Sequence, residues 1–225
     1  MSEQDFHGLE LLPDLLRPRQ LFILLHGLGV DSSDLVPLAH QLQVVYPDAA
    51  FLIPEGIAPF DGGVIGRQWY SINGMTEENR HARITSALPA LHSLVQHAQD
   101  KLSILPTDTA LVGFSQGANM ALELSAIHDD IVGRVVAFSG RYSKFPEKAP
   151  ALTTIHLLHG EDDYVIAVDH ANAAFDWLTA LQGDATIDIA SSVGHEIHPA
   201  LVERAISRLQ TCVPLRSWKR ALGSE

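Results

Sequence analysis

Residues 110–119 read Ala-Leu-Val-Gly-Phe-Ser-Gln-Gly-Ala-Asn, and they predict a sharp turn from a strand into a helix at Ser115. The first residues form a compact apolar run, and those after the serine have the composition and spacing of a buried helix. Glycines stand two residues either side of the serine, at Gly113 and Gly117, because so tight a turn leaves no room for side chains there. This arrangement is a nucleophile elbow, which lifts the hydroxyl to the carboxyl end of a sheet and the positive end of the next helix.

The glycine and serine pattern alone is weak evidence, since about one chain in a dozen of this length would contain it by chance. The alternative is an ordinary strand-to-helix turn with no chemical role. The readable strand before Ser115 and the readable helix after it favour the chemical interpretation. We therefore treat Ser115 as a candidate nucleophile.

The composition is that of an ordinary globular protein and predicts one domain over residues 1–225. Of the 225 residues, 46% are hydrophobic and 19% are charged, so a sizeable core is available. Prolines interrupt residues 1–19, which we expect to be irregular with at most a short edge strand near residues 9–12. Residues 211–225 are expected to form a C-terminal tail.

Charge and cysteine content exclude several classes of partner. Acidic residues outnumber basic ones by 27 to 15, and the net charge of -12 argues against nucleic acid and anionic membranes. Cys212 is the only cysteine, so no intrachain disulfide can form. No apolar run is long enough to span a bilayer, and the N-terminus lacks a signal-peptide pattern. We expect a soluble cytoplasmic protein without stable membrane insertion.

Strands and helices alternate along the chain. Residues 20–25 have almost no polar side chain, which indicates a strand buried on both faces and hence a parallel sheet covered by helices. The first helix should begin near residue 31, with Ser32 or Ser33 as its cap. Further strands are predicted at residues 49–53, 110–112, 135–138, 154–158 and 186–190, and further helices at 76–101, 115–124, 168–181 and 199–209. This alternation predicts an α/β fold with a doubly wound, mainly parallel sheet flanked by helices and no large lid domain.

Residues 55–74 are rich in glycine and lack a clear periodicity, so they predict a long loop. Long ordered loops in compact domains are commonly functional. The apolar side chains of Phe60, Ile65, Trp69 and Tyr70 could wall an acyl pocket, or they could close the core under the loop. The sequence leaves both interpretations open. Exposed apolar residues in this loop would also favour a homodimer.

A catalytic serine needs a nearby base and an acid that orients the base. Three consecutive acidic residues follow the strand predicted at 154–158, and among them Asp163 is our choice for the acid, with Asp162 second. The base is assigned to His195, since the glycine before it suits a turn back to the sheet edge; His198 is the competitor. Serine, aspartate and histidine then occur in the order expected of an α/β-hydrolase.

The other histidines do not predict a metal site. His92 with His97, and His156 with His159, come without paired carboxylates or cysteines, so we interpret them as structural or surface residues. No phosphate-cradling or dinucleotide-binding motif is present. We therefore predict neither a metal nor a cofactor.

The chain resembles the phospholipase/carboxylesterase and acyl-protein thioesterase family of α/β-hydrolases, and more closely its bacterial cytoplasmic serine-esterase branch. The resemblance covers roughly residues 20–210, and the serine motif with Gln116 after the serine is its most specific part. The matching segments are residues 25–29 (Leu-His-Gly-Leu-Gly), 66–70 (Gly-Arg-Gln-Trp-Tyr), 76–80 (Thr-Glu-Glu-Asn-Arg), 113–118 (Gly-Phe-Ser-Gln-Gly-Ala), 159–163 (His-Gly-Glu-Asp-Asp) and 194–195 (Gly-His).

The resemblance implies hydrolysis of esters or thioesters without a cofactor, through an acyl-enzyme on Ser115. In that family two backbone N–H groups hold the oxyanion, and they match Leu28 and Gln116 here. Family members commonly have Asp directly after the His-Gly-Leu-Gly run, whereas this chain has Val30 and then Asp31. The residues that we predict to bind substrate are Gly29, Ile65, Trp69 and Val165.

These observations predict a serine carboxylesterase that acts on small-molecule esters of short to medium chain length, with an acyl-protein thioesterase or a lysophospholipase as the alternative. A dienelactone-hydrolase-like enzyme would resemble this fold but has a cysteine at the elbow, where Ser115 stands here. A non-catalytic binding protein with a hydrolase fold usually shows a damaged triad, whereas all three candidates are present in this chain. The motifs do not specify the acyl group.

Overall fold

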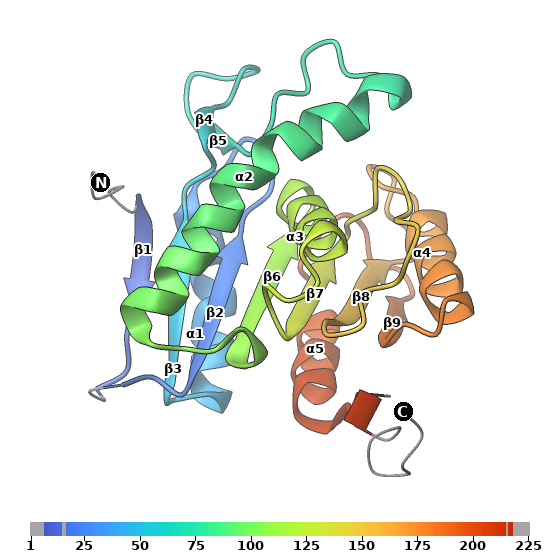
Figure 1. Cartoon of the computed structure of the whole chain (residues 1–225). Helices are drawn as coiled ribbons and strands as arrows, with labels where there is room; N and C mark the ends of the chain where they lie inside the picture. Colours follow the sequence, from blue (N-terminus) through green and yellow to red (C-terminus); the bar gives the residue numbers. More distant parts are fainter. Residues whose placement is uncertain (1–6, 15–16, 215, 218–225) are drawn as a thin grey trace.

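The structure is a computed structural model that describes residues 7–14, 17–214 and 216–217. Its centre is a seven-stranded sheet in the order β1-β3-β2-β6-β7-β8-β9 (Figure 1). β1 pairs antiparallel with β3, and the other neighbouring strands are parallel. The strands are β1 Gly8–Leu11, β2 Gln20–Leu25, β3 Ala49–Pro54, β6 Thr109–Phe114, β7 Arg134–Phe138, β8 Thr154–Gly160 and β9 Ala185–Ala190. The predicted mainly parallel α/β sheet is confirmed.

Helices cover both faces of this sheet, as Figure 1 shows. Side chains of α2 (Glu77–Leu102), α3 (Gln116–Ile127) and α4 (Asp169–Ala180) share one apolar cluster with one face of the sheet. Those of α1 (Val36–Val45) and α5 (Pro199–Thr211) share a second cluster with the other face. Alternate residues of β2 enter the two clusters, which explains why this strand has almost no polar residue.

Two local features differ from the expectation. The helix predicted from residue 31 begins as a 3-10 helix, η1 (Ser32–Leu35), and its cap is Asp31, whose Oδ1 accepts the backbone N–H of Ser33 at 2.9 Å. An aspartate caps as well as a serine does, so composition alone does not choose between adjacent candidates. The loop at residues 55–74 contains a hairpin of β4 (Ala58–Pro59) and β5 (Arg67–Gln68). Strands of two residues are too short to leave a periodic signal.

The helix predicted at 76–101 is confirmed as α2. The residues at its start form a capping motif, which is the local sequence signal for a helix N-terminus. Thr76 accepts the backbone N–H of Asn79, while Oδ1 of Asn79 accepts the backbone N–H of Thr76 at 2.9 Å, which is a capping box. Among the helices of the described residues, none combines the length and apolar character needed to cross a bilayer.

His156, in the middle of β8, couples the stability of this sheet to pH. Its ring is fully buried, its Nδ1 lies 2.8 Å from Oγ1 of Thr186, and its Nε2 has no hydrogen-bond partner within the described residues. Burial lowers the pKa of His156 to about 3. The unfolded chain therefore binds this proton at a higher pH, near 6.5, than the folded chain does. Stability is present above pH 6.5 and is lost as the pH falls towards 3.

We expect the His156→Gln variant to lose less stability in acid than the wild type. Between pH 7 and pH 5 the wild-type free energy of unfolding should fall by about 2 kcal/mol more than that of the variant, because glutamine has no proton to bind. Urea denaturation at the two pH values measures the difference. Equal losses in both proteins would mean that His156 is not the group responsible.

Candidate active site

Ser115 sits in a strained turn between β6 and α3. Its φ and ψ are 54° and -114°, a backbone conformation that costs a residue other than glycine on the order of 1 to 3 kcal/mol. A Cβ on Gly117 would lie 2.1 Å from the carbonyl oxygen of Leu25, and a Cβ on Gly113 would lie 2.5 Å from the backbone of Gly117. The turn therefore requires both glycines, as the sequence pattern predicts.

The three predicted catalytic side chains form one hydrogen-bonded chain. Nε2 of His195 lies 2.9 Å from Oγ of Ser115, and Nδ1 of the same ring lies 2.7 Å from Oδ2 of Asp163. The neighbouring candidates lie elsewhere. Asp162 is exposed and its backbone N–H bonds to Val193, while His198 caps α5 by accepting the N–H of Ala200.

Asp163 is held at the end of β8 by its own loop. Its Oδ1 accepts the backbone N–H groups of Val165 at 2.9 Å and Ile166 at 2.8 Å, so the carboxyl is oriented from the side opposite His195. Burial alone would raise the pKa of Asp163, but hydrogen bonds from His195, Ile166 and Val165 outweigh it, and this pKa lies below its usual value. Asp163 is therefore a carboxylate near neutral pH.

A second histidine contacts this carboxylate, which the sequence did not predict. Nε2 of His159 donates to the carbonyl of Ile166 at 2.7 Å and lies 3.3 Å from Oδ2 of Asp163. Burial lowers the pKa of His159, so this ring is neutral near pH 7. Since His159 bonds to the backbone of the loop that carries Asp163, it is a structural residue, as expected, but one that supports the site.

The loop after β2 lies against the serine. A Cβ on Gly27 would come within 3.6 Å of Cβ of Ser115, so the loop that carries Leu28 passes beside the nucleophile. Gln116 is the first residue of α3, and its backbone N–H belongs to those that have no acceptor within the helix. The two predicted oxyanion donors therefore come from backbone segments that meet at Ser115.

The predicted substrate-binding residues do not share one environment. Ile65 and Val165 are exposed, and the backbone of Gly29 has a φ of 81° and packs against Gly66. Trp69, in contrast, is fully buried within the core, and its indole Nε1 donates to the carbonyl of His26 at 3.0 Å. This burial favours the second interpretation of Trp69, in which the ring closes the core, and corrects its assignment to substrate binding.

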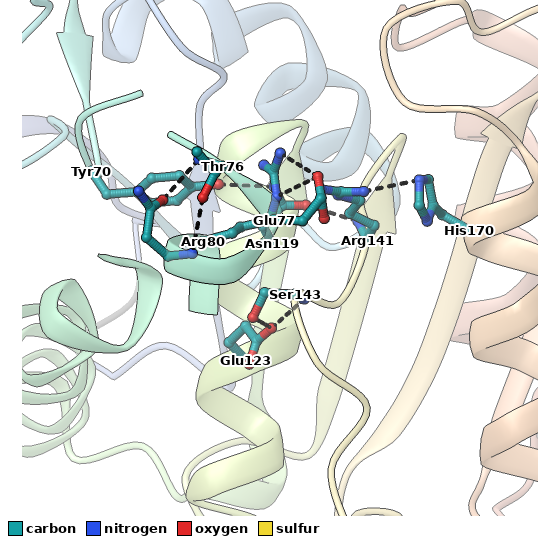
Figure 2. Close-up of polar contacts among 10 residues, drawn as sticks. Tyr70, Thr76, Glu77, Arg80, Asn119, Glu123, Arg141, Ser143 and His170 are labelled. Carbon is teal, nitrogen blue, oxygen red and sulfur yellow. Dashed lines mark hydrogen bonds and ion pairs between the residues drawn. The ribbon is translucent and has the colours of Figure 1, made fainter. Parts of the chain in front are cut away.

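A polar network ties the start of α2 to the rim of the sheet, and sequence reasoning missed it (Figure 2). Arg141, just after β7, bonds through its guanidinium to Glu77 at 2.8 Å and to Nε2 of His170 at 3.0 Å. Arg80 also bonds to Glu77 at 2.9 Å. Hydrogen bonds from Arg141 and then Arg80 lower the pKa of Glu77 to about 2. The network joins three elements far apart in the sequence, so only the acidic and basic pair at the start of α2 could have suggested it.

The described residues contain no candidate metal site. Among the described residues, no group of three or more histidine, cysteine, aspartate or glutamate side chains is arranged to hold a metal ion.

Three kinds of comparison place the chain among known proteins. A family model described as phospholipase/carboxylesterase matches residues 12–213. The chain is 38% identical over 204 residues to Esterase YpfH of Escherichia coli (strain K12), covering 91% of this chain and 88% of that protein. It is 30% identical over 150 residues to acyl-protein thioesterase 1 of Saccharomyces cerevisiae, covering 60% of this chain and 63% of that protein.

Solved structures show the same fold. The crystal structure of esterase PE8 matches with a TM-score of 0.83 at 28% identity, covering 92% of this chain and 99% of that one. The Bacillus cereus carboxylesterase shares the fold at 19% identity with a TM-score of 0.76, covering 92% of this chain and 94% of that one. With the family model, these matches show that the chain belongs to the phospholipase/carboxylesterase family of α/β-hydrolases.

Proposed function

We propose that this protein is a serine carboxylesterase that hydrolyses short- to medium-chain carboxylic esters through an acyl-enzyme on Ser115. The observation that carries the proposal is the continuous chain from Ser115 through His195 to Asp163, with contacts of 2.9 and 2.7 Å. A serine hydroxyl is a weak nucleophile until a base within hydrogen-bond reach removes its proton, and that base works only when it is held in the correct orientation.

In the first step, Nε2 of His195 accepts the Ser115 proton while Oγ attacks the ester carbonyl carbon. The Asp163 carboxylate holds the proton on Nδ1, which leaves Nε2 free to act as the base and stabilises the imidazolium that forms. The carbonyl electrons move to oxygen, where the N–H groups of Leu28 and Gln116 are proposed to donate. The imidazolium then gives its proton to the leaving alcohol as the ester C–O bond breaks.

The second step releases the acid. A water molecule gives a proton to His195 and attacks the acyl-enzyme, and the same two N–H groups stabilise the second oxyanion. The Ser115 oxygen leaves with the proton from His195, which regenerates the hydroxyl. Every proton moves through one imidazole ring, so this proposal includes neither a cofactor nor a metal.

A thioester would follow the same two steps, and the relatives named acyl-protein thioesterase 1 support that alternative. The preference for short to medium acyl chains is inferred from the segments between the strands, none of which forms an inserted lid domain within the described residues. Ile65 and Val165, both exposed, are the proposed apolar contacts for the acyl group, and Gly29 is a further proposed contact of the substrate.

The cellular compartment and the oligomeric state of the enzyme are also proposals. We infer that it works in the cytoplasm, because a single cysteine gives no sign of the disulfides typical of oxidising compartments. A homodimer is proposed from the exposed apolar side chains Ile57, Val64 and Ile65 of the loop at residues 55–74.

We expect a fluorophosphonate probe to label the wild-type protein at one serine, identified by peptide mass spectrometry as Ser115. A panel of p-nitrophenyl esters and matching thioesters, graded by acyl length, should give its highest kcat/KM at short to medium length. A protein that neither reacts with the probe nor turns over any ester would be a binding protein, and the proposal would fail. Highest activity on long-chain thioesters would support the thioesterase alternative.

A further inference from the structure

Residues 67–70, which we call the brace segment, contact both halves of the proposed oxyanion hole. The segment runs from β5 to Tyr70 and includes the buried Gln68, Trp69 and Tyr70 side chains. In the sequence, Trp69 is 43 residues from His26 in one half and 47 residues from Gln116 in the other. The fold brings the brace segment into contact with both halves of the proposed oxyanion hole.

On one side, the brace segment bonds to the loop that carries Leu28, before and after that residue. The indole Nε1 of Trp69 donates to the carbonyl of His26 at 3.0 Å. The backbone of Arg67 accepts the N–H of Gly29 at 2.9 Å and donates to the carbonyl of Val30 at 2.8 Å. These bonds hold the His26–Gly27 and Leu28–Gly29 peptide groups, which lie on either side of the Gly27–Leu28 peptide that carries the Leu28 N–H, and so they restrict the direction of that N–H.

On the other side, the brace segment bonds to the first turn of α3. The side-chain amide of Gln116 makes two buried hydrogen bonds, accepting the backbone N–H of Trp69 at 2.7 Å and donating to the carbonyl of Tyr70 at 2.8 Å. One turn later, Nδ2 of Asn119 donates to the Tyr70 hydroxyl at 2.9 Å (Figure 2). Gln116 thus supplies a backbone donor to the oxyanion and a side-chain clamp to the brace segment.

We propose that the brace segment sets the separation and direction of the two oxyanion N–H groups, and that Trp69 and the Gln116 side chain are positioning residues for the transition state. The inference rests on the proposed function. It follows because donors stabilise an oxyanion only when they lie about 2.7 to 3.1 Å from its position before the reaction begins. Misplacement of a reacting group by about 1 Å can cost about 10²-fold in rate.

A positioning role and ordinary core packing predict different effects on kcat, KM and stability. A positioning residue alters binding of the transition state and leaves binding of the substrate largely unaffected, so kcat falls while KM stays close to its wild-type value. A packing residue lowers stability and does not selectively weaken binding of a transition-state analogue.

The variants are Gln116→Met, which keeps the length of the side chain but removes both hydrogen bonds, and Trp69→Phe, which removes the indole N–H. The chain offers matched controls. Gln99 is also buried and makes two hydrogen bonds through Nε2, to Thr109 and Ile131, at the opposite end of β6 from Ser115. Trp177, a residue of α4, stacks on Phe145. Gln99→Met and Trp177→Phe therefore show how much the same substitutions change kcat and the inhibition constant when they are made away from the site.

We expect kcat on the best ester of the panel to fall about 10²-fold in Gln116→Met and about tenfold in Trp69→Phe, with KM within about threefold of wild type. The inhibition constant of a trifluoromethyl ketone with the same acyl chain, whose hemiketal oxygen occupies the oxyanion position, should rise by the same factors. Both controls should keep kcat and the inhibition constant within about twofold. Circular dichroism verifies folding, and Trp69→Phe carries the test alone if Gln116→Met does not fold.

The brace inference is overturned if either folded variant keeps its kcat, if the loss appears in KM, or if the controls lose as much. Failure of the proposed function would look different, because the wild-type protein itself would then lack turnover and fluorophosphonate labelling. A labelled, active wild type with unaffected variants removes the brace role alone.

Discussion

Ser115→Ala should reduce ester hydrolysis by on the order of 10⁵- to 10⁶-fold, because loss of the nucleophile in a serine hydrolase removes the covalent route altogether. The residual rate would come from the oxyanion donors acting on water. Hydrolysis of p-nitrophenyl butyrate by purified protein measures the loss, and fluorophosphonate labelling should disappear with it.

Ser125→Ala is the matched control, since Ser125 lies on the same helix, is fully buried and bonds to the carbonyl of Leu122 at 3.0 Å. This variant should remain active and labelled. If Ser115→Ala kept a few per cent of wild-type activity, the nucleophile would have to be another residue and the elbow would be only a turn.

Asp163→Asn should lower kcat by about 10²- to 10⁴-fold while preserving the shape of the site. The Asp163 carboxylate accepts the proton on Nδ1 of His195, whereas an amide nitrogen in that place would favour the tautomer with the proton on Nε2. That tautomer cannot remove the Ser115 proton. The lower end of the range allows for partial substitution by the neighbouring carboxylate.

Asp162→Asn provides the comparison. Asp162 is exposed, and its backbone is held by Val193, so the substitution should cost less than about tenfold in kcat. Steady-state kinetics on both variants, with circular dichroism to verify folding, ranks the two carboxylates. The reverse ranking would transfer the orienting role to Asp162 and leave the roles of Ser115 and His195 unchanged.

The fold and the triad geometry could be anticipated because their signals are local. A strand buried on both faces, such as β2, shows itself as a run of apolar residues, and the elbow shows itself through the two glycines around Ser115. The acid and the base could be placed because each follows a strand, and parallel strands bring their carboxyl ends to one edge. The assignments of Ser115 and His195 therefore needed only the order of the elements, whereas Asp163 is favoured over Asp162 by its place in the family resemblance.

The parts that could not be anticipated depend on contacts between distant residues. Trp69 is an aromatic residue in a glycine-rich loop, and nothing in its local sequence distinguishes a pocket wall from a core residue that bonds to His26. The buried contact between His159 and Asp163 has the i, i+4 spacing, but it forms across a loop after a strand, where that spacing carries no regular geometry. The Glu77 and Arg141 pair is separated by 64 residues.

The two edge strands of the sheet, β1 and β9, are poorly suited to pair with a further strand. β1 has only four residues, and Glu10 within it pairs with Lys101 at 2.9 Å. At the other end, Asp188 of β9 pairs with Arg204 and Arg208, each at 2.8 Å. Outer strands that are short, as β1 is, or that carry charged side chains, as both do, are poor templates for another chain, because an added strand would have to desolvate these ion pairs. Stacking of copies edge to edge into a continuous sheet is thus disfavoured, so even concentrated protein should resist fibrillar association through its strands.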